Sequence, residues 1–308
     1  MKLRSMLMAS VTLAFATQAY AEGCDKVTFS DVGWTDITST TAVTSLIVTA
    51  LGYETETQVL SVPVTYTGLA GGDIDVFLGN WMPSMANDIK PYAEAKTVDT
   101  VKANLEGAKY TLATNEAGAA LGIADFKDIA AQKDALEGKI YGIEPGNDGN
   151  RLVLDMITSG PFGLDGFELV ESSEQGMLAE VDKHDGEAKP IVWLGWAPHP
   201  MNAKFKMTYL TGGDDYFGPN FGGATVYTNT RAGYVAECPN VGKLLTNLSF
   251  TLDMENAIMS AIQNDGIDPG TAAKTWLAAN PDALGPWLDG VTTKDGGDAM
   301  AAVTAALQ

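Results

Sequence analysis

Short apolar segments of strand length alternate with segments of helical periodicity along most of this sequence. Residues 27–31 alternate apolar and polar side chains, and a helix is predicted after them, from Asp36 or Thr38 to Leu51. Further strands are predicted at residues 56–62, 74–78, 110–113, 140–143 and 191–194. This rhythm is typical of α/β folds, in which parallel sheets carry helices on both faces.

The strand–helix–strand rhythm occurs twice, in residues 25–90 and again in residues 110–200. It therefore predicts two α/β lobes, each with a sheet flanked by helices. The rest of the chain is predicted to be mostly helical and to belong with the first lobe, so the chain crosses between the lobes twice. The expected boundaries are 22–112 and 205–308 for lobe I and 113–204 for lobe II.

The first 21 residues have the three parts of a secretory signal peptide. Lys2 and Arg4 give a basic start, residues 6–16 are apolar, and the small-residue motif Ala19-Tyr20-Ala21 follows. The apolar run is too short to span a bilayer. We therefore expect export to the periplasm with cleavage after Ala21. The alternative is a buried N-terminal helix.

The chain has two cysteines, Cys24 and Cys238. In an exported protein an even number of cysteines favours a disulfide, which here would bring the N-terminus next to the segment near residue 238. One alternative is a lipid on Cys24, but Glu22 stands where a lipidation sequence needs a small residue. The other alternative is that both thiols are free.

Charge and motifs exclude several classes of function. Lys and Arg total 19 and Asp and Glu total 39, so the net charge is −20. No basic excess exists to neutralise phosphates, and neither nucleic acid nor an anionic membrane surface is an expected partner. The two histidines form no zinc motif, and nucleophile-elbow and phosphate-loop motifs are absent from the sequence. We expect no metal and no cofactor.

Four residues share one position relative to the predicted strands. Trp34, Trp81, Asn147 and Trp196 each lie just past the carboxyl end of a predicted strand, one or two residues after a glycine. In open α/β sheets, ligands bind beyond the carboxyl ends of the strands, and glycine lets the backbone turn sharply there. The sequence therefore predicts a shared binding site with aromatic walls.

Nucleobases, sugars and quaternary ammonium groups all bind to aromatic surfaces, and the net charge excludes nucleic acid. A methylated ammonium group has no N–H to donate, so its recognition depends on the π faces around it. Each desolvated cation–π contact contributes about 2 kcal/mol, and four contacts give about 8 kcal/mol before desolvation and closure are subtracted. The acidic composition also favours a cationic ligand over an anionic one.

Four segments resemble the periplasmic substrate-binding proteins of quaternary-amine ABC importers. They are Gly33-Trp34-Thr35-Asp36, Gly79-Asn80-Trp81-Met82-Pro83, Pro145-Gly146-Asn147 and Trp193-Leu194-Gly195-Trp196-Ala197-Pro198-His199. The resemblance covers essentially the whole mature chain and is closest to the choline-binding members of the family. It implies a type II-like periplasmic binding protein fold, in which two lobes close over the ligand. It also implies a membrane permease as partner, no catalysis, and a monomer.

The resemblance implies a set of ligand-binding residues as well. Tyr110 matches the fourth aromatic wall, which the strand-end argument does not reach. Asp36 and Asn147 match the polar pair that completes a choline site, and the division of labour between them cannot be read from the sequence. The implied ligand-binding residues are Trp34, Asp36, Trp81, Tyr110, Asn147 and Trp196.

Choline is favoured over betaines on physical grounds. A betaine carboxylate needs N–H groups, Arg, Lys or His, and near the aromatic residues only Arg151 and His199 qualify. Asp36 would repel such a carboxylate and suits an alcohol. Acetylcholine is expected to bind more weakly, because its ester extends beyond the hydroxyl position.

Other functions stay open. A binding protein for glycine betaine or proline betaine is the first alternative, and a chemosensor partner cannot be distinguished from a transport partner by sequence. A secreted glycan-binding protein or glycosidase is less favoured. A glycosidase needs two facing carboxylates, and only Asp36, Glu144 and Asp148 lie near the predicted site.

Overall fold

A computed structural model describes residues 24–308, and the predicted signal peptide lies outside the described residues. The strands are β1 (Lys26–Asp31), β2 (Glu54–Val59), β3 (Val76–Met82), β4 (Val98–Asn115), β5 (Lys139–Tyr141), β6 (Glu168–Val170), β7 (Val192–Ala197), β8 (Met207–Tyr209) and β9 (Gly223–Arg231). The helices are α1 (Thr35–Ala50), α2 (Val62–Gly71), α3 (Ala86–Ala95), α4 (Glu116–Ala120), α5 (Phe126–Ile129), α6 (Asp148–Ser159), α7 (Glu174–Gly186), α8 (Met201–Lys204), α9 (Asp214–Phe217), α10 (Pro219–Gly222), α11 (Tyr234–Glu237), α12 (Pro239–Asn247), α13 (Leu252–Gln263), α14 (Pro269–Ala279), α15 (Leu284–Trp287) and α16 (Ala299–Ala306). No helix within residues 24–308 is long and apolar enough to cross a membrane.

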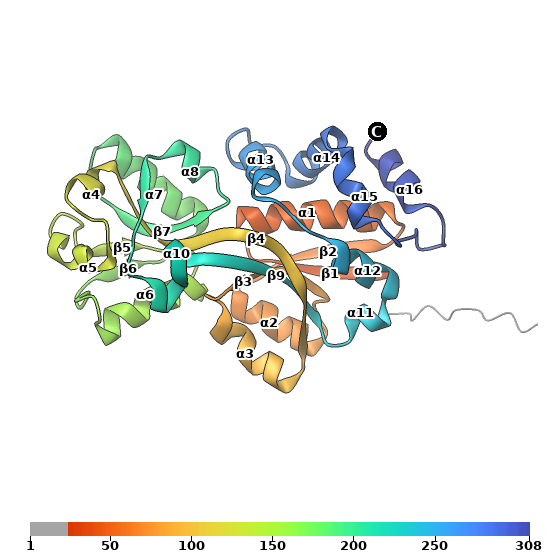
Figure 1. Ribbon diagram of the computed structural model, residues 1–308, viewed down its shortest axis with the longest axis horizontal. Coiled ribbons are helices and arrows are strands. Elements are labelled where there is room, and N and C mark those ends of the chain that lie inside the picture. Colours follow the sequence, from red (N-terminus) through yellow and green to blue (C-terminus); the bar gives the residue numbers. More distant parts are fainter. Residues whose placement is uncertain (1–23) are drawn as a thin grey trace, which may run out of the picture.

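The elements form two groups at the two ends of one mixed sheet (Figure 1). The first group contains β1 to β3 with helices α1 to α3 and α11 to α16, and the second contains β5 to β7 with helices α4 to α8. The order of the sheet is β2-β1-β3-β9-β4-β7-β5-β6, and β8 pairs with β4. The long strands β4 and β9 run between the groups and make them continuous.

The parallel sheets expected from the sequence exist only at the two ends of this sheet. β1 pairs in parallel with β2 and β3, and β5 pairs in parallel with β6 and β7. The middle is antiparallel, because β4 pairs with β9 over residues 98–109 and with β7 over residues 109–114. The single 18-residue strand β4 thus connects the two parallel ends of the sheet.

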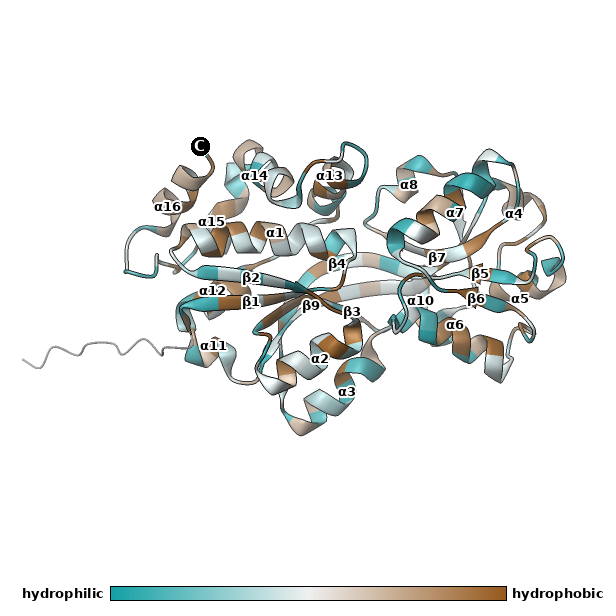
Figure 2. Ribbon diagram, turned by 180° about the vertical axis from the view of Figure 1, so that it is seen from behind, coloured by the Kyte–Doolittle hydropathy of each residue, from teal (hydrophilic) through white to brown (hydrophobic). Residues whose placement is uncertain are grey.

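The core of the first group lies between its sheet and the helices on either face. Helix α1 covers one face, while α2 and α3 lie on the other, and the brown segments of β1 and β3 run between them (Figure 2). Phe29 of β1 and Phe77 of β3 are fully buried there. The polar Ser30 of β1 is buried too and bonds to Thr65, because helices cover both faces of the sheet; the alternation in this strand therefore does not mark a solvent-facing side.

Several elements differ from the sequence prediction. The strand expected at residues 56–62 ends at Val59, and α2 begins at Val62 with Pro63 in its first turn, where a missing N–H costs nothing. Helix α3 was not predicted. Strand β9 was also missed, because the region after lobe II was expected to be mostly helical.

The sequence pattern did not predict β9, because this strand contains several polar residues although it is buried. Its Thr228, Asn229 and Thr230 are inaccessible to solvent. The Oγ1 of Thr228 accepts a hydrogen bond of 3.1 Å from the side-chain amide of Asn104, and the Asn229 amide donates to the Oγ1 of Thr100 at 3.0 Å. Buried polar groups are stable when they are paired in this way, and sequence periodicity does not reveal such pairing.

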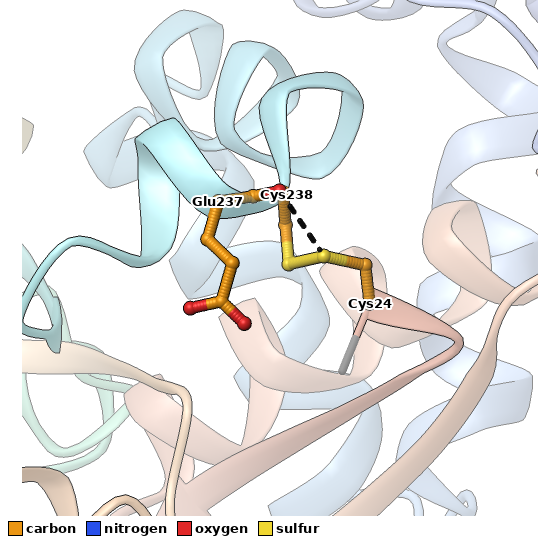
Figure 3. A group of neighbouring side chains, drawn as sticks. All are labelled: Cys24, Glu237 and Cys238. Carbon is orange, nitrogen blue, oxygen red and sulfur yellow. Dashed lines mark hydrogen bonds between the residues drawn. A yellow bond between two sulfur atoms is a disulfide. The ribbon is translucent and has the colours of Figure 1, made fainter. Parts of the chain in front are cut away.

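Cys24 and Cys238 form a disulfide, as the sequence predicted, with their Cα atoms 5.5 Å apart (Figure 3). The bond ties the start of β1 to the start of α12. Together with Glu237, these residues are the one group of three potential metal ligands within residues 24–308. Metal ligation by cysteine requires a thiolate, and both sulfur atoms are already consumed by the disulfide. The group therefore has no metal-binding role in this form of the protein.

Candidate functional site

All six residues predicted to bind the ligand line a single cavity between the two groups of elements. The unfilled space among the lining side chains, including the part open to solvent, is about 260 Å³. The lining residues are Trp34, Asp36, Trp81, Tyr110, Asn147 and Trp196, with Ile143 and Asp148 in addition.

Turns after a strand place Trp34 and Asn147. Trp81 and Trp196 lie inside β3 and β7 instead, so the prediction that each follows a strand end is wrong for these two residues. Trp34 is the residue before helix α1, which begins at Thr35 rather than at the later residues the sequence favoured. Gly33 has φ +82°, and Gly146, before Asn147, has φ +86°; both values lie in the region that favours glycine. Asn147 is the N-cap of α6, and its side chain accepts a hydrogen bond from the Asn150 N–H. Gly33 and Gly146 thus produce the turns that the sequence argument required, whereas Gly79 and Gly195 belong to β3 and β7 and make no turn.

Three aromatic rings meet edge to face around the cavity. The ring of Tyr110, on β4, lies 6.1 Å from the ring of Trp81 on β3 and 6.2 Å from the ring of Trp196 on β7. The interplanar angles are 64° and 87°, so the rings form walls at steep angles to one another. Phe217 supports Tyr110 from behind at 5.5 Å. Trp34 completes the aromatic lining of the cavity.

The two indole N–H groups from the first group are tied to carboxylates. Nε1 of Trp34 donates to Oε1 of Glu144 at 2.9 Å, and Nε1 of Trp81 donates to Oδ2 of Asp36 at 3.1 Å. These bonds satisfy the polar edge of each indole, so they fix its orientation. The contact between Trp34 and Glu144 also joins the two groups of elements.

Asp36 is a buried carboxylate with a free oxygen. It lies in the first turn of α1 and is 1% exposed. Its Oδ1 has no hydrogen-bond partner within residues 24–308, because only Oδ2 receives the Trp81 indole. Burial raises the pKa of Asp36 to about 8, and the nearby negative charge of Glu174 adds to this rise. The free oxygen therefore marks a place where a cation would offset the cost of burial.

Asn147 already uses its full hydrogen-bonding capacity. Its Oδ1 accepts from the Tyr110 hydroxyl at 2.9 Å and from the Asn150 N–H at 3.1 Å. Its amide donates to Glu144 at 3.4 Å and to Asp148 at 3.2 Å. An amide offers two acceptor and two donor positions, so Asn147 holds the cavity wall in place and leaves little for a ligand.

Asp148 is a lining residue that the sequence argument did not select for ligand binding. Its Oδ2 is buried and has no hydrogen-bond partner in the described part of the chain. Burial raises the pKa of Asp148 to about 6 and the pKa of the neighbouring Glu144 to about 7. The sequence does contain an indication that Asp148 lies at the site, since Asp148 directly follows Asn147 after the same strand. Ile143 was missed because an apolar residue carries no such signal.

Arg151 and His199, the two basic residues near the aromatic residues in sequence, form their contacts outside the cavity. Arg151 forms an ion pair with Asp88 and donates to the backbone oxygen of Gly146. His199 contacts Glu174 through Nε2 at 3.1 Å and accepts the Met201 N–H through Nδ1 at 3.0 Å. Neither Arg151 nor His199 is among the residues that line the cavity.

The cavity therefore combines aromatic faces with carboxylate oxygens that have no partner. Such a site attracts a cation through the ring quadrupoles and through direct charge. It offers no guanidinium, ammonium or imidazole among its lining residues to bind an anion. The arrangement thus suits a compact organic cation whose charged head cannot donate hydrogen bonds.

Comparison with known proteins agrees with this geometry. The family model described as OpuAC, the substrate-binding domain of ABC-type glycine betaine transport systems, matches residues 25–279. A solved ABC-transporter choline-binding protein in complex with choline is 68% identical, with a TM-score of 0.93 over 94% of this chain and 100% of that chain. An unliganded semi-closed structure of an ABC-transporter choline-binding protein is 69% identical, with a TM-score of 0.86 over 93% and 99%. Lactococcal OpuAC in its closed form with glycine betaine is 26% identical, with a TM-score of 0.77 over 85% and 99%.

Proposed function

The chain belongs to the OpuAC family of substrate-binding domains of ABC-type glycine betaine transport systems, and we propose that it captures choline and delivers it to the membrane permease of an ABC importer. Proteins of this family bind substrates for transport and are not enzymes. The observation that carries the choice of choline is the cavity itself, with four aromatic walls around two unpaired carboxylate oxygens. Relatives at 68% and 69% identity that are choline-binding proteins support it.

In this proposal the trimethylammonium head lies among Trp34, Trp81, Tyr110 and Trp196. The head cannot donate hydrogen bonds, so the ring faces replace its water shell. The free oxygens of Asp36 and Asp148 balance the positive charge, and one of them accepts the choline hydroxyl. Asn147 holds the wall by its bonds to Tyr110 and the start of α6.

Betaines are the second candidate, because the family description and lactococcal OpuAC both refer to glycine betaine. A betaine adds a carboxylate that needs donors. Arg151 and His199 form contacts outside the cavity. The acidic Asp36 and Asp148 line the cavity, and Glu144 bonds to the indole of Trp34 at its edge. We therefore expect both betaines and acetylcholine to bind with lower affinity than choline.

Two lobes close over the ligand in this proposal, with lobe I at residues 24–112 and 205–308 and lobe II at residues 113–204. Lobe I corresponds to the first group of elements and lobe II to the second. We place the return to lobe I between residues 217 and 223 rather than at residue 205, since β8 still pairs with the lobe II end of β4 and the ring of Phe217 lies 6.0 Å from the ring of Phe126. Binding proteins of ABC importers act outside the cytoplasmic membrane, and we propose a periplasmic location after cleavage at Ala21.

A competition titration tests the proposed ligand. Choline, acetylcholine and glycine betaine are titrated against the intrinsic tryptophan fluorescence of the mature protein, and each isotherm is repeated by calorimetry. We expect saturable binding in the order choline, acetylcholine, glycine betaine. Tighter binding of glycine betaine than of choline would move the function to the betaine branch. Absence of heat with every trimethylammonium compound would refute the proposal.

Acidification should weaken choline binding. The pKa values of about 8, 7 and 6 at Asp36, Glu144 and Asp148 are raised by burial, and a bound cation favours the ionised form of each group. Protonation therefore competes with choline, and the affinity should fall by about tenfold or more between pH 8 and pH 5.5. The neutral isostere 3,3-dimethyl-1-butanol is the control, because its affinity should change little over this range. An affinity for choline that does not change with pH would contradict the role of the carboxyl groups.

A further inference from the structure

A buried polar cluster behind the aromatic cavity joins the two groups of elements. Glu174, the first residue of α7, contributes a carboxylate whose side chain has no solvent exposure. Its Oε2 accepts the backbone N–H of Thr35 at 2.8 Å, and its Oε1 accepts the Thr35 hydroxyl at 2.5 Å. Thr35 is the first residue of α1, so a carboxylate from the second group binds the helix start of the first.

Gln263 and His199 complete the cluster from both sides. The amide of Gln263, the last residue of α13, donates to the Thr35 hydroxyl at 2.8 Å and also to Glu174. His199 accepts the Met201 N–H at Nδ1, which leaves the proton on Nε2, 3.1 Å from the Glu174 carboxylate. Both oxygens of the Glu174 carboxylate are thus hydrogen-bonded, as a buried carboxylate requires.

The cluster is coupled to the cavity through its neighbours in the chain and in space. Thr35 lies between Trp34 and Asp36, two lining residues. The hydrogen bonds from Thr35 to Glu174 therefore also fix the positions of both neighbours. The ring of His199 lies 4.8 Å from the ring of Trp196, a third lining residue. The cluster is formed in a structure that matches the choline-bound relative better than the unliganded semi-closed one, with TM-scores of 0.93 and 0.86.

We propose that Glu174 is a positioning residue that latches the closed state, by binding Thr35 and Gln263 across the cleft once the ligand is enclosed. The inference rests on the proposed function and adds to it the control of ligand release. Separation of the groups would break these contacts and leave the Glu174 carboxylate to water. The latch therefore favours the closed form only, and it slows dissociation without affecting the first encounter with the ligand.

We expect the hydrogen bonds of Glu174 to stabilise the closed form more than the ion pair between the two groups does. Arg151 of α6 meets Asp88 of α3 across the cleft, but the Arg151 side chain is 36% exposed. Exposed ion pairs contribute little, since water and salt screen them. The Glu174 cluster is shielded from both.

Stopped-flow measurement of choline binding tests the latch. Glu174→Gln has nearly the same shape but presents an amide to the donors of Thr35. We expect its dissociation rate to rise at least fivefold, while the association rate stays within twofold of the parent rate. The melting temperature without ligand should stay unchanged, and the increase in melting temperature with choline should shrink. Glu180→Gln on the same helix is the matched control, because Glu180 contacts only Lys183 and His184 on the surface.

A second variant separates the latch from general disruption. Gln263→Glu places two carboxylates face to face and should also speed dissociation. The double variant Glu174→Gln, Gln263→Glu exchanges the amide and the carboxylate, and it should release choline more slowly than Gln263→Glu alone.

The outcomes that overturn the inference are distinct. Dissociation rates of both single variants within twofold of the parent rate would overturn it. So would a ligand-free melting temperature that falls as far as the ligand-bound one, or a double variant that releases choline as fast as Gln263→Glu. A parent protein that binds no choline would instead refute the proposed function, and the latch with it.

Discussion

Replacement of Trp196 by alanine should weaken choline binding about 100-fold while the protein remains folded. The indole forms one wall of the cavity and lies at 87° to the ring of Tyr110. One desolvated cation–π contact is worth about 2 kcal/mol, and the open wall admits water that weakens the remaining contacts. Together these losses correspond to about 2.7 kcal/mol. Calorimetric titration with choline measures the change.

Two further substitutions separate the π face from the space that the indole fills. Trp196→Leu keeps an apolar wall without a ring quadrupole and should lose nearly as much affinity as alanine. Trp196→Phe keeps a smaller ring and should lose less. Trp276→Ala is the matched control, because Trp276 belongs to α14, packs against the hydrophobic core and does not line the cavity. An alanine variant whose affinity stays within threefold of the parent would rule out the aromatic site, provided that circular dichroism shows both proteins folded.

The Asp36→Asn variant is expected to bind choline about 30-fold more weakly than the parent. Asparagine keeps the shape and still accepts the Trp81 indole N–H, so the change removes the charge and little else. Loss of one partner of a buried charge pair costs 2 kcal/mol or more, and about 2 kcal/mol is a factor of about 30. Choline and glycine betaine are titrated in parallel, because glycine betaine should lose less affinity, since Asp36 repels its carboxylate.

The comparison of the two ligands makes this variant informative. An equal loss for choline and glycine betaine would remove any discriminating role for Asp36. Asp148→Asn is the companion variant, because its free oxygen lines the same cavity. It should weaken choline in the same direction. Asp185→Asn, at a carboxylate of α7 that does not line the cavity, should leave both affinities unchanged.

The aromatic lining could be predicted because it is encoded locally. After β1 the chain turns at Gly33, and the Trp34 ring that follows lines the cavity. Trp81 and Trp196 line the same cavity from inside β3 and β7, close to their carboxyl ends. Such a signal needs only a few neighbouring residues. The disulfide could be predicted for a comparable reason, since an exported chain with two cysteines has one possible pairing.

Other features depended on partners far apart in the sequence. Strand β9 is polar, and only its bonds to distant residues such as Asn104 make it a central strand. Asn147 seemed suited to bind the ligand hydroxyl, yet Tyr110, 37 positions earlier, takes up its oxygen. Arg151 lies beside the site in sequence and turns toward Asp88 instead.

The sequence pattern therefore placed Trp34, Trp81, Asn147 and Trp196 at one site, whereas Ile143 and Asp148 were recognised as lining residues only in the structure. Tertiary structure decided which atoms of those side chains stay free. A hydrogen bond needs its partner within about 3 Å, and residues as distant as Thr35 and Glu174, 139 positions apart, come that close only when the two groups pack together. The tryptophans of the cavity could thus be recognised from their local sequence, whereas the two free carboxylate oxygens and the Glu174 contact exist only in the folded protein.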